Sequence, residues 1–219
     1  MLLRIASACA VLVLLLGGIS AAWFFLYSRD LPDIGDLRRY APQQATRVSG
    51  PCTQAESIAI PYETLGYNVR SAISSAEANL PTGRAGLSAQ LAKTTFCEPS
   101  RMLERHIKGA RVAAQIRLRF SSDEILTICA NRVWFGDGQV GVEAGSQYYF
   151  GKDPNQLGIA EAALLVGLVR SPSNYSPYKH ADRALQRRNA VIDAMVQNRA
   201  ISAEQGELAK GTSLEVVSR

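Results

Sequence analysis

The chain has 219 residues, of which 47% are hydrophobic and 20% are charged. This length accommodates one domain plus an anchor but is short for two domains, and the composition argues against long disorder. The formal net charge of +5 and the isoelectric point near 9.2 favour a phosphate-bearing partner or an anionic membrane surface. A mildly basic soluble surface is the alternative, and no nucleic-acid partner is expected.

Residues 5–27 form a strongly apolar stretch without a charged side chain. As a helix this stretch is long enough to cross a bilayer of about 30 Å. Trp23 and Tyr27 stand near its end, where aromatic rings favour the headgroup zone. A cleaved signal peptide is the alternative, because residues 20–22 are small. We favour an uncleaved transmembrane anchor over residues 1–28, because the apolar run continues past that site.

A polar linker and three helices are expected after the anchor. Residues 29–55 carry prolines and show no sustained periodicity, which predicts a juxtamembrane linker. A short extended piece is expected at 58–61. Apolar residues at helical spacing predict helices over 68–79, over 101–120 and from Ser122 onward. Ser122 is the expected N-cap of the third helix, because the two acidic residues after it suit a first helical turn.

The remaining sequence also predicts helices. A glycine turn at 135–138 is expected to end the third helix. Further helices are predicted over 142–150, 159–169 and 182–197, with a loop at 172–177. The helix at 159–169 is expected to be buried, and the amphipathic helix at 182–197 is expected to turn its arginines outward. Because the sequence shows no strand alternation or internal repeat, the predicted fold is mainly α-helical.

Four cysteines are present, one of which, Cys9, lies in the apolar span. Cys52 and Cys97 stand beside prolines in loop-like sequence, so a disulfide between them is a hypothesis for an oxidising compartment. Cys129 falls on the apolar face of a predicted helix, which favours a buried small hydrophobe. No cysteine spacing indicates a metal site.

The most specific pattern of the sequence lies between residues 123 and 178. Its features in chain order are Asn131, Phe135-Gly136, Gly141 to Ala144, Tyr149 to Lys152, Glu161 to Leu164, and Pro172, Asn174, Tyr175 and Pro177. This order closely resembles the peptidoglycan glycosyltransferase domain (glycosyltransferase family 51) of class A penicillin-binding proteins and monofunctional transglycosylases. The resemblance implies a lysozyme-like α-helical domain over residues 56–210, followed by a tail at 211–219.

The resemblance also implies an activity and a location. Members of the family polymerise lipid II into glycan strands, so the implied partners are lipid II, the nascent strand and other cell-wall synthesis proteins. The implied location is the inner membrane, with a single span and the catalytic domain in the periplasm. Mg²⁺ is the one cofactor implied, as an aid to the pyrophosphate leaving group, and no metal site made by the protein alone is expected.

Glu77 is the candidate catalytic base. Glycosyl transfer from a lipid pyrophosphate requires a carboxylate near the acceptor hydroxyl and cations near the pyrophosphate. The run from Ile60 to Glu77 resembles the family's approach to its first motif, which puts Glu77 at the position of the base. Ala78 replaces the aspartate that follows in the family, and the rest of the motif is missing. A solvated glutamate near a helix end is the alternative.

The candidate substrate-binding residues come from the other motifs. Residues 83–93, which read GRAGLSAQLAK, resemble the second motif, which binds donor phosphate and sugar. There Lys93 would offer a point charge and Ser88 a hydroxyl, and Gln90 matches the family residue. Lys152 is assigned to substrate binding on the same resemblance. Ordinary solvated side chains are the alternative.

The third motif is altered in this chain. Arg105 matches one of its cations and is assigned to substrate binding, whereas Gly109 stands where the family has its second catalytic glutamate. Glycine supplies no carboxylate and costs about 1 kcal/mol of helix propensity relative to alanine. Glu143 and Glu161, in later motifs, are not implied to be catalytic, and we expect Glu161 to cap a helix or to pair within the fold.

Three functions remain open. In the first, Glu77 activates the acceptor hydroxyl while Lys93 and Arg105 stabilise the departing pyrophosphate. In the second, the chain is an inactive family member that binds lipid II or cell-wall synthesis partners as a scaffold, which Gly109, Ala78 and the shortened first motif favour. In the third, the chain is a lytic hydrolase, which would release muropeptides from sacculi; the match in the later motifs argues against it.

Overall fold

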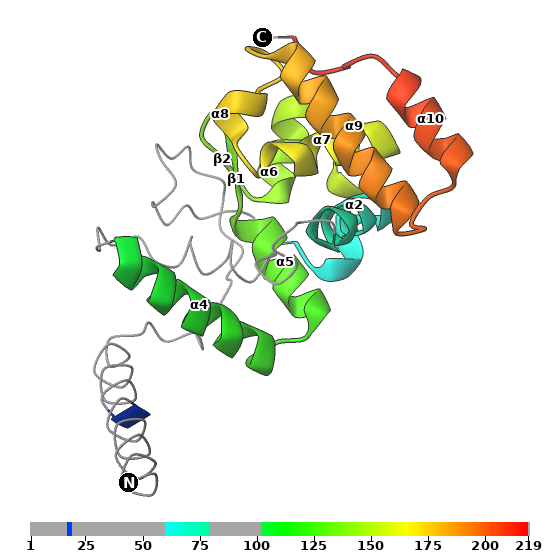
Figure 1. Cartoon of the computed structure of the whole chain (residues 1–219). Coiled ribbons are helices and arrows are strands. Elements are labelled where there is room, and N and C mark those ends of the chain that lie inside the picture. Colours follow the sequence, from blue (N-terminus) through cyan, green and yellow to red (C-terminus); the bar gives the residue numbers. More distant parts are fainter. Residues whose placement is uncertain (1–16, 19–59, 79–101, 219) are drawn as a thin grey trace, which may run out of the picture.

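The computed structural model describes residues 17–18, 60–78 and 102–218, and for 102–108 it describes the backbone alone. Within these ranges the chain is mainly α-helical with one short hairpin, which confirms the predicted class (Figure 1). No helix of these ranges is long and apolar enough to cross a membrane. Apart from Gly17 and Gly18, the expected span at 5–27 lies outside the described residues, as do Cys52 and Cys97.

Three helices form the centre of the core: α2 (Tyr67–Ala78), α7 (Ile159–Leu168) and α9 (Ala181–Gln197) pack against one another. From Ala162 to Leu168 every residue of α7 is buried, because this segment is apolar and lies between the other two helices. α10 (Ala203–Gly211), which the sequence did not predict, packs against α9. The predicted helices at 68–79, 159–169 and 182–197 are therefore confirmed in the part that the structure describes.

α4 (Met102–Arg119) and α5 (Ser122–Arg132) follow one another along the chain. The N-cap of α5 is Ser121, so the expectation of Ser122 is wrong by one residue. The Ser121 hydroxyl accepts a hydrogen bond from the backbone N–H of Glu124 at 3.2 Å, and the Glu124 carboxylate accepts one from the Ser121 N–H at 2.8 Å. This reciprocal pair requires a glutamate or glutamine three residues after the N-cap. Ser121 has Glu124 at that position, whereas Ser122 has Ile125.

A β-hairpin connects α5 to α6 (Val142–Phe150). The expectation that a glycine turn at 135–138 ends α5 is therefore wrong. The helix ends at Arg132, and β1 (Trp134–Gly136) then pairs antiparallel with β2 (Gln139–Val140). At the tip Asp137 and Gly138 have φ of 50° and 79°, as a two-residue hairpin turn requires. The glycines of this segment therefore shape a hairpin, and α6 begins at the predicted residue.

The segment at 172–177, expected as a loop, contains the helical turn α8 (Pro172–Tyr175). Pro172 suits the first position of a helix, where its missing N–H has no intrahelical partner to lose. α8 packs against β1 and α9. Two 3₁₀ turns complete the described elements, η2 (Tyr62–Leu65) before α2 and η3 (Pro154–Gln156) before α7.

The arginines of α9 do not all face outward, which corrects the expectation for this helix. Arg188 is 2% exposed and lies beneath the C-terminal end of α10. Its Nη1 and Nη2 atoms donate to the carbonyl oxygens of Thr212 and Lys210, each at 2.8 Å. A buried guanidinium is tolerated here because its donors have partners.

Gly66, which joins η2 to α2, occupies a position that only glycine fits. Its φ is 73°, and an added Cβ would lie 2.6 Å from the Cα of Asn155. We expect Gly66→Ala to lower the free energy of unfolding by about 2 to 3 kcal/mol, through backbone strain and displacement of η3. Urea unfolding followed by circular dichroism checks this value.

Gly211→Ala is the matched control for this substitution, because a Cβ at Gly211 would meet no atom within 4 Å. We expect the control to unfold like the parent protein. If the two variants unfold with the same free energy, the close approach of Gly66 to Asn155 does not contribute to stability.

Candidate active site

Glu77 lies on the last turn of α2 and is partly buried. Its side chain acts on α5, because burial raises the pKa of the Cys129 thiol and the negative charge of Glu77 raises it further. Arg132, one turn along α5, lowers the same pKa. The carboxylate of Glu77 therefore lies within electrostatic reach of Cys129, at the place where α2 and α5 meet.

Cys129 itself is a free thiol that is 1% exposed. Its raised pKa keeps it protonated at neutral pH, so it does not supply a nucleophile. The expectation of a buried small hydrophobe at this position is confirmed. Glu77 is the one carboxylate in α2. It is therefore the acid that α2 places near this part of α5.

The approach of the chain to α2 is fixed by Asn131 on α5. The Ile60 N–H donates to the Asn131 side-chain oxygen at 3.0 Å, and the Asn131 side-chain nitrogen donates to the Ile60 carbonyl at 2.9 Å. Asn131 is 3% exposed, so these bonds are shielded from water and hold the segment firmly. Because Ile60 leads through η2 into α2, this pair helps to position Glu77.

α4 carries the third motif, and Gly109 lies on it with open space beside it. Among the described residues, a Cβ added at Gly109 would meet no atom within 4 Å. The backbone therefore leaves room for a side chain at the position where a second carboxylate was expected from the resemblance. Arg105 lies on the same helix, where only its backbone is described.

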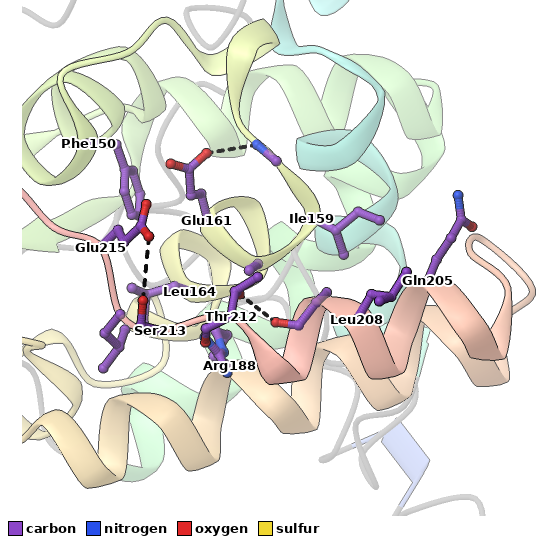
Figure 2. A pocket seen from close by; sticks show the side chains of 14 residues that line it. Phe150, Ile159, Glu161, Leu164, Arg188, Gln205, Leu208, Thr212, Ser213 and Glu215 are labelled. Carbon is purple, nitrogen blue, oxygen red and sulfur yellow. Dashed lines mark hydrogen bonds between the residues drawn. The ribbon is translucent and has the colours of Figure 1, made fainter.

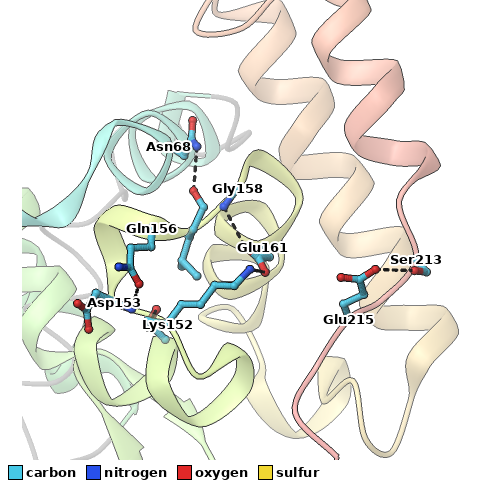
Figure 3. Close-up of polar contacts among 10 residues, drawn as sticks. Asn68, Lys152, Asp153, Gln156, Gly158, Glu161, Ser213 and Glu215 are labelled. Atoms are coloured by element: carbon cyan, nitrogen blue, oxygen red, sulfur yellow. Dashed lines mark hydrogen bonds and ion pairs between the residues drawn. The ribbon is translucent and has the colours of Figure 1, made fainter.

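The other candidate residues divide into two groups. Ser88, Gln90 and Lys93 lie outside the described residues, so their assignment stays a prediction. Lys152 follows α6, and its Nζ lies 2.6 Å from a carboxylate oxygen of Glu161 (Figure 3). The second oxygen of Glu161 accepts a hydrogen bond from the Gly158 N–H at 2.8 Å, which caps α7. The expected structural role of Glu161 is confirmed.

In the Lys152–Glu161 pair the Lys152 side chain is 45% exposed and the Glu161 side chain 18%. The hydrogen bond to Glu161 raises the pKa of Lys152. Lys152 therefore remains charged at neutral pH, while its ammonium group is already engaged with the start of α7. Substrate binding by Lys152 stays a prediction.

We expect Glu161→Ala to lower the free energy of unfolding by about 1 to 2 kcal/mol, because it removes the cap of α7 together with the ion pair. Glu161→Gln keeps an oxygen that can accept from Gly158 and should cost only a few tenths of a kcal/mol. Urea denaturation of both variants measures the difference. If the glutamine variant is as unstable as the alanine variant, the ion pair rather than the cap is the important interaction.

A cavity of about 360 Å³ lies at the side of the fold where α10 and the C-terminal segment meet α7 (Figure 2). Its walls are mainly apolar, with Phe150, Leu164 and Leu208 among them, and Glu161 lies at one end. Glu77 and Lys152, the two candidate site residues whose side chains the structure describes, are not part of its lining. We therefore locate the candidate active site at the α2–α5 junction and not in this cavity.

The chain is similar to several known proteins. A family model described as Transglycosylase matches residues 62–196, a range that includes Glu77 and Gly109. Penicillin-binding protein 1A of Aquifex aeolicus is 41% identical over 149 residues, which cover 68% of this chain and 20% of that protein. Penicillin-binding protein 1A of Rickettsia felis is 29% identical over 245 aligned positions, covering 96% of this chain and 31% of that protein.

Among solved structures, the crystal structure of penicillin-binding protein 1A from Haemophilus influenzae matches with a TM-score of 0.49 and 23% identity. The match covers 78% of this chain and 19% of that chain. The chain thus spans 19% to 31% of the length of these relatives.

Proposed function

The chain belongs to the transglycosylase family, and from this membership we propose that it is a membrane-anchored peptidoglycan glycosyltransferase that polymerises lipid II into glycan strands. The observation that carries the proposal is the family match over 62–196, together with Glu77 at the end of α2, whose charge acts on Cys129 of α5. The charge-free apolar stretch at 5–27 supports anchoring in the inner membrane, with the domain in the periplasm.

In the proposed reaction Glu77 takes the proton of the acceptor sugar hydroxyl. The hydroxyl oxygen forms a bond to the anomeric carbon of the donor with inversion, and the bond from that carbon to the pyrophosphate oxygen breaks. The lipid pyrophosphate leaves with the electron pair of that bond. Lys93 and Arg105 are assigned to stabilise the charge that develops on it.

Mg²⁺ was expected as an aid to this leaving group. The described ranges bring together no group of three or more histidine, cysteine, aspartate or glutamate side chains that could hold a metal ion. The binding of Mg²⁺ stays a prediction, and no step of the proposed reaction passes through it.

The alternative is a family member that binds lipid II or cell-wall synthesis partners without turnover. The observation that favours it is Gly109, which leaves the position of the second carboxylate empty. Loss of a general acid or base typically lowers a rate by about 10²- to 10⁴-fold. The two functions therefore predict very different rates for the same preparation.

The experiment that separates them is glycan-chain formation from labelled lipid II by the full-length protein in detergent. We expect a polymer whose formation is inhibited by moenomycin, an inhibitor of the family. If lipid II binds but no polymer forms, the scaffold function is correct. Release of muropeptides from purified sacculi would instead indicate a lytic hydrolase.

Gly109→Glu is the substitution that tests the missing carboxylate directly. Because the added side chain has room and glutamate favours a helix over glycine, we expect the variant to be at least as stable as the parent. We also expect its polymerisation rate to rise about tenfold or more, toward the contribution of a general acid or base. Gly109→Gln, which has the same shape without the charge, is the control and should not accelerate the reaction.

A further inference from the structure

The C-terminal segment, defined here as residues 213–218, follows α10 without forming a helix (Figure 1). Its exposure alternates from residue to residue. Leu214 and Val216 are partly buried and pack against the core, whereas the residues on either side of each are exposed. This alternation is typical of an extended strand with one face against the core.

One edge of this segment is already paired. The Val217 N–H donates to the Tyr149 carbonyl at 2.9 Å, and the Tyr178 hydroxyl donates to the Val217 carbonyl at 3.1 Å. In an extended strand the N–H and C=O of one residue lie on the same edge, and the next residue presents its own to the opposite edge. The backbone groups of Leu214 and Val216 therefore lie on the other edge, where no described residue pairs with them. An unpaired edge is a template for another strand.

The apolar cavity of about 360 Å³ lies beside the C-terminal segment. Residues 213–215 form part of its wall, together with Leu208 of α10 and Phe150 of α6 (Figure 2). Leu208 is 68% exposed, so the apolar lining continues to the surface. An apolar hollow with an exposed apolar residue at its edge is typical of a binding surface.

The polar groups in the wall of this cavity are already engaged within the chain. The two carboxylate oxygens of Glu161 accept from Lys152 and from Gly158. The Arg188 guanidinium donates three hydrogen bonds, and the Thr212 hydroxyl donates to a backbone carbonyl at 2.7 Å. The cavity therefore suits an apolar side chain better than a polar small molecule.

The two elements that border the cavity are acidic, although the chain as a whole has a net charge of +5. α10 and the C-terminal segment carry Glu204, Glu207 and Glu215, against one lysine, Lys210. The Lys210 Nζ lies 2.6 Å from a carboxylate oxygen of Asp193 and 2.9 Å from one of Glu207. This charge favours a basic partner and disfavours an anionic lipid surface.

We propose that an extended, basic segment of a partner protein adds as a strand to the free edge of the C-terminal segment and places an apolar side chain in the cavity. Because side chains alternate along a strand, apolar side chains beside Leu214 would face the cavity, and basic side chains opposite Glu215 would face solvent. The recognised segment thus alternates apolar and basic residues. Main-chain hydrogen bonds supply affinity in this mode, and the alternate side chains supply specificity.

The probe is a fluorescein-labelled peptide, Lys-Val-Lys-Leu-Lys-Val, titrated with the full-length protein in neutral detergent and followed by fluorescence anisotropy. We expect saturable binding that weakens about tenfold in Glu215→Lys and in Leu208→Ala. Both residues are exposed, so the variants should fold. Asp123→Lys makes the same charge change at an exposed acid of α5 and, as the matched control, should bind like the parent. This test does not depend on polymerisation, because no substrate is turned over.

Strand pairing is tested with two further peptides, one N-methylated on the backbone of the lysines and the other on the valines and the leucine. Only one edge of an added strand contacts the protein, so one methylated peptide should bind about tenfold more weakly and the other like the parent peptide.

The proposal is overturned if the two methylated peptides bind equally, or if Glu215→Lys and Leu208→Ala both bind the parent peptide as tightly as the unchanged protein. It is also overturned if a peptide with glutamate in place of lysine binds equally well. Absence of peptide binding, with self-association that Leu208→Ala abolishes, would overturn it too and assign this surface to a second copy of the chain.

Discussion

Replacing Glu77 by glutamine should lower the rate of lipid II polymerisation by about 10²- to 10⁴-fold, because the amide cannot accept the proton of the acceptor hydroxyl. Glu77 is partly exposed on the last turn of α2 and is not a core residue, so the fold should persist. The measurement is the initial rate of polymer formation from labelled lipid II, together with the melting temperature of the variant.

Glu63→Gln is the matched control, since Glu63 is an exposed acid in η2, shortly before α2. It should polymerise at the parental rate. A Glu77→Gln protein that is folded and retains the parental rate would remove Glu77 from the role of base. A combined Glu77→Gln and Gly109→Glu variant then shows whether the two positions act in one reaction, because the added carboxylate should not rescue the lost base.

The sequence predicted the position of Glu77 on its helix but not its surroundings. The helix at 68–79 follows from local periodicity, so the position of Glu77 near its C-terminal end could be predicted from the sequence. That the charge of Glu77 acts on Cys129 depends on how α2 packs against α5, two segments about fifty residues apart in the chain. Periodicity carries no information on such pairings, and only the family resemblance suggested that this glutamate mattered.

Some of the missed features had a local signal and others had none. Asp137-Gly138 between short apolar segments is a recognised two-residue hairpin signal, and Ser121 has the glutamate three residues later that a capping box needs. Arg188 has no such signal, because an arginine in the pattern of an amphipathic helix predicts a solvated side chain. Its burial depends on carbonyl groups at the end of α10, more than twenty residues further along the chain.

The contrast between Arg187 and Arg188 shows why residue type alone does not assign a role. Both arginines occupy adjacent positions on α9, and burial lowers the pKa of each. Arg188 donates hydrogen bonds to Asn189, Thr212 and Lys210. The buried Nε of Arg187 has no hydrogen-bond partner in the described ranges. Arg188 is therefore expected to affect stability more than Arg187 does.

Arg188→Ala should lower the free energy of unfolding by about 3 to 5 kcal/mol. The substitution leaves the carbonyl groups of Thr212 and Lys210 without their donors and opens a cavity between α9 and α10. For a chain of this size the loss corresponds to a fall in melting temperature of roughly 10 °C or more. Differential scanning calorimetry in phosphate-free buffer measures it.

Arg187→Gln is the control, and in the same buffer it should melt close to the parent, since no hydrogen bond is lost. Arg188→Lys should recover only part of the stability, because an ammonium group cannot reach both carbonyls as the planar guanidinium does. If Arg188→Ala and Arg187→Gln melt at the same temperature, the attachment of α10 through Arg188 does not stabilise the fold. A separation of several degrees between them would instead confirm that Arg188, and not the adjacent Arg187, holds α10 to the core.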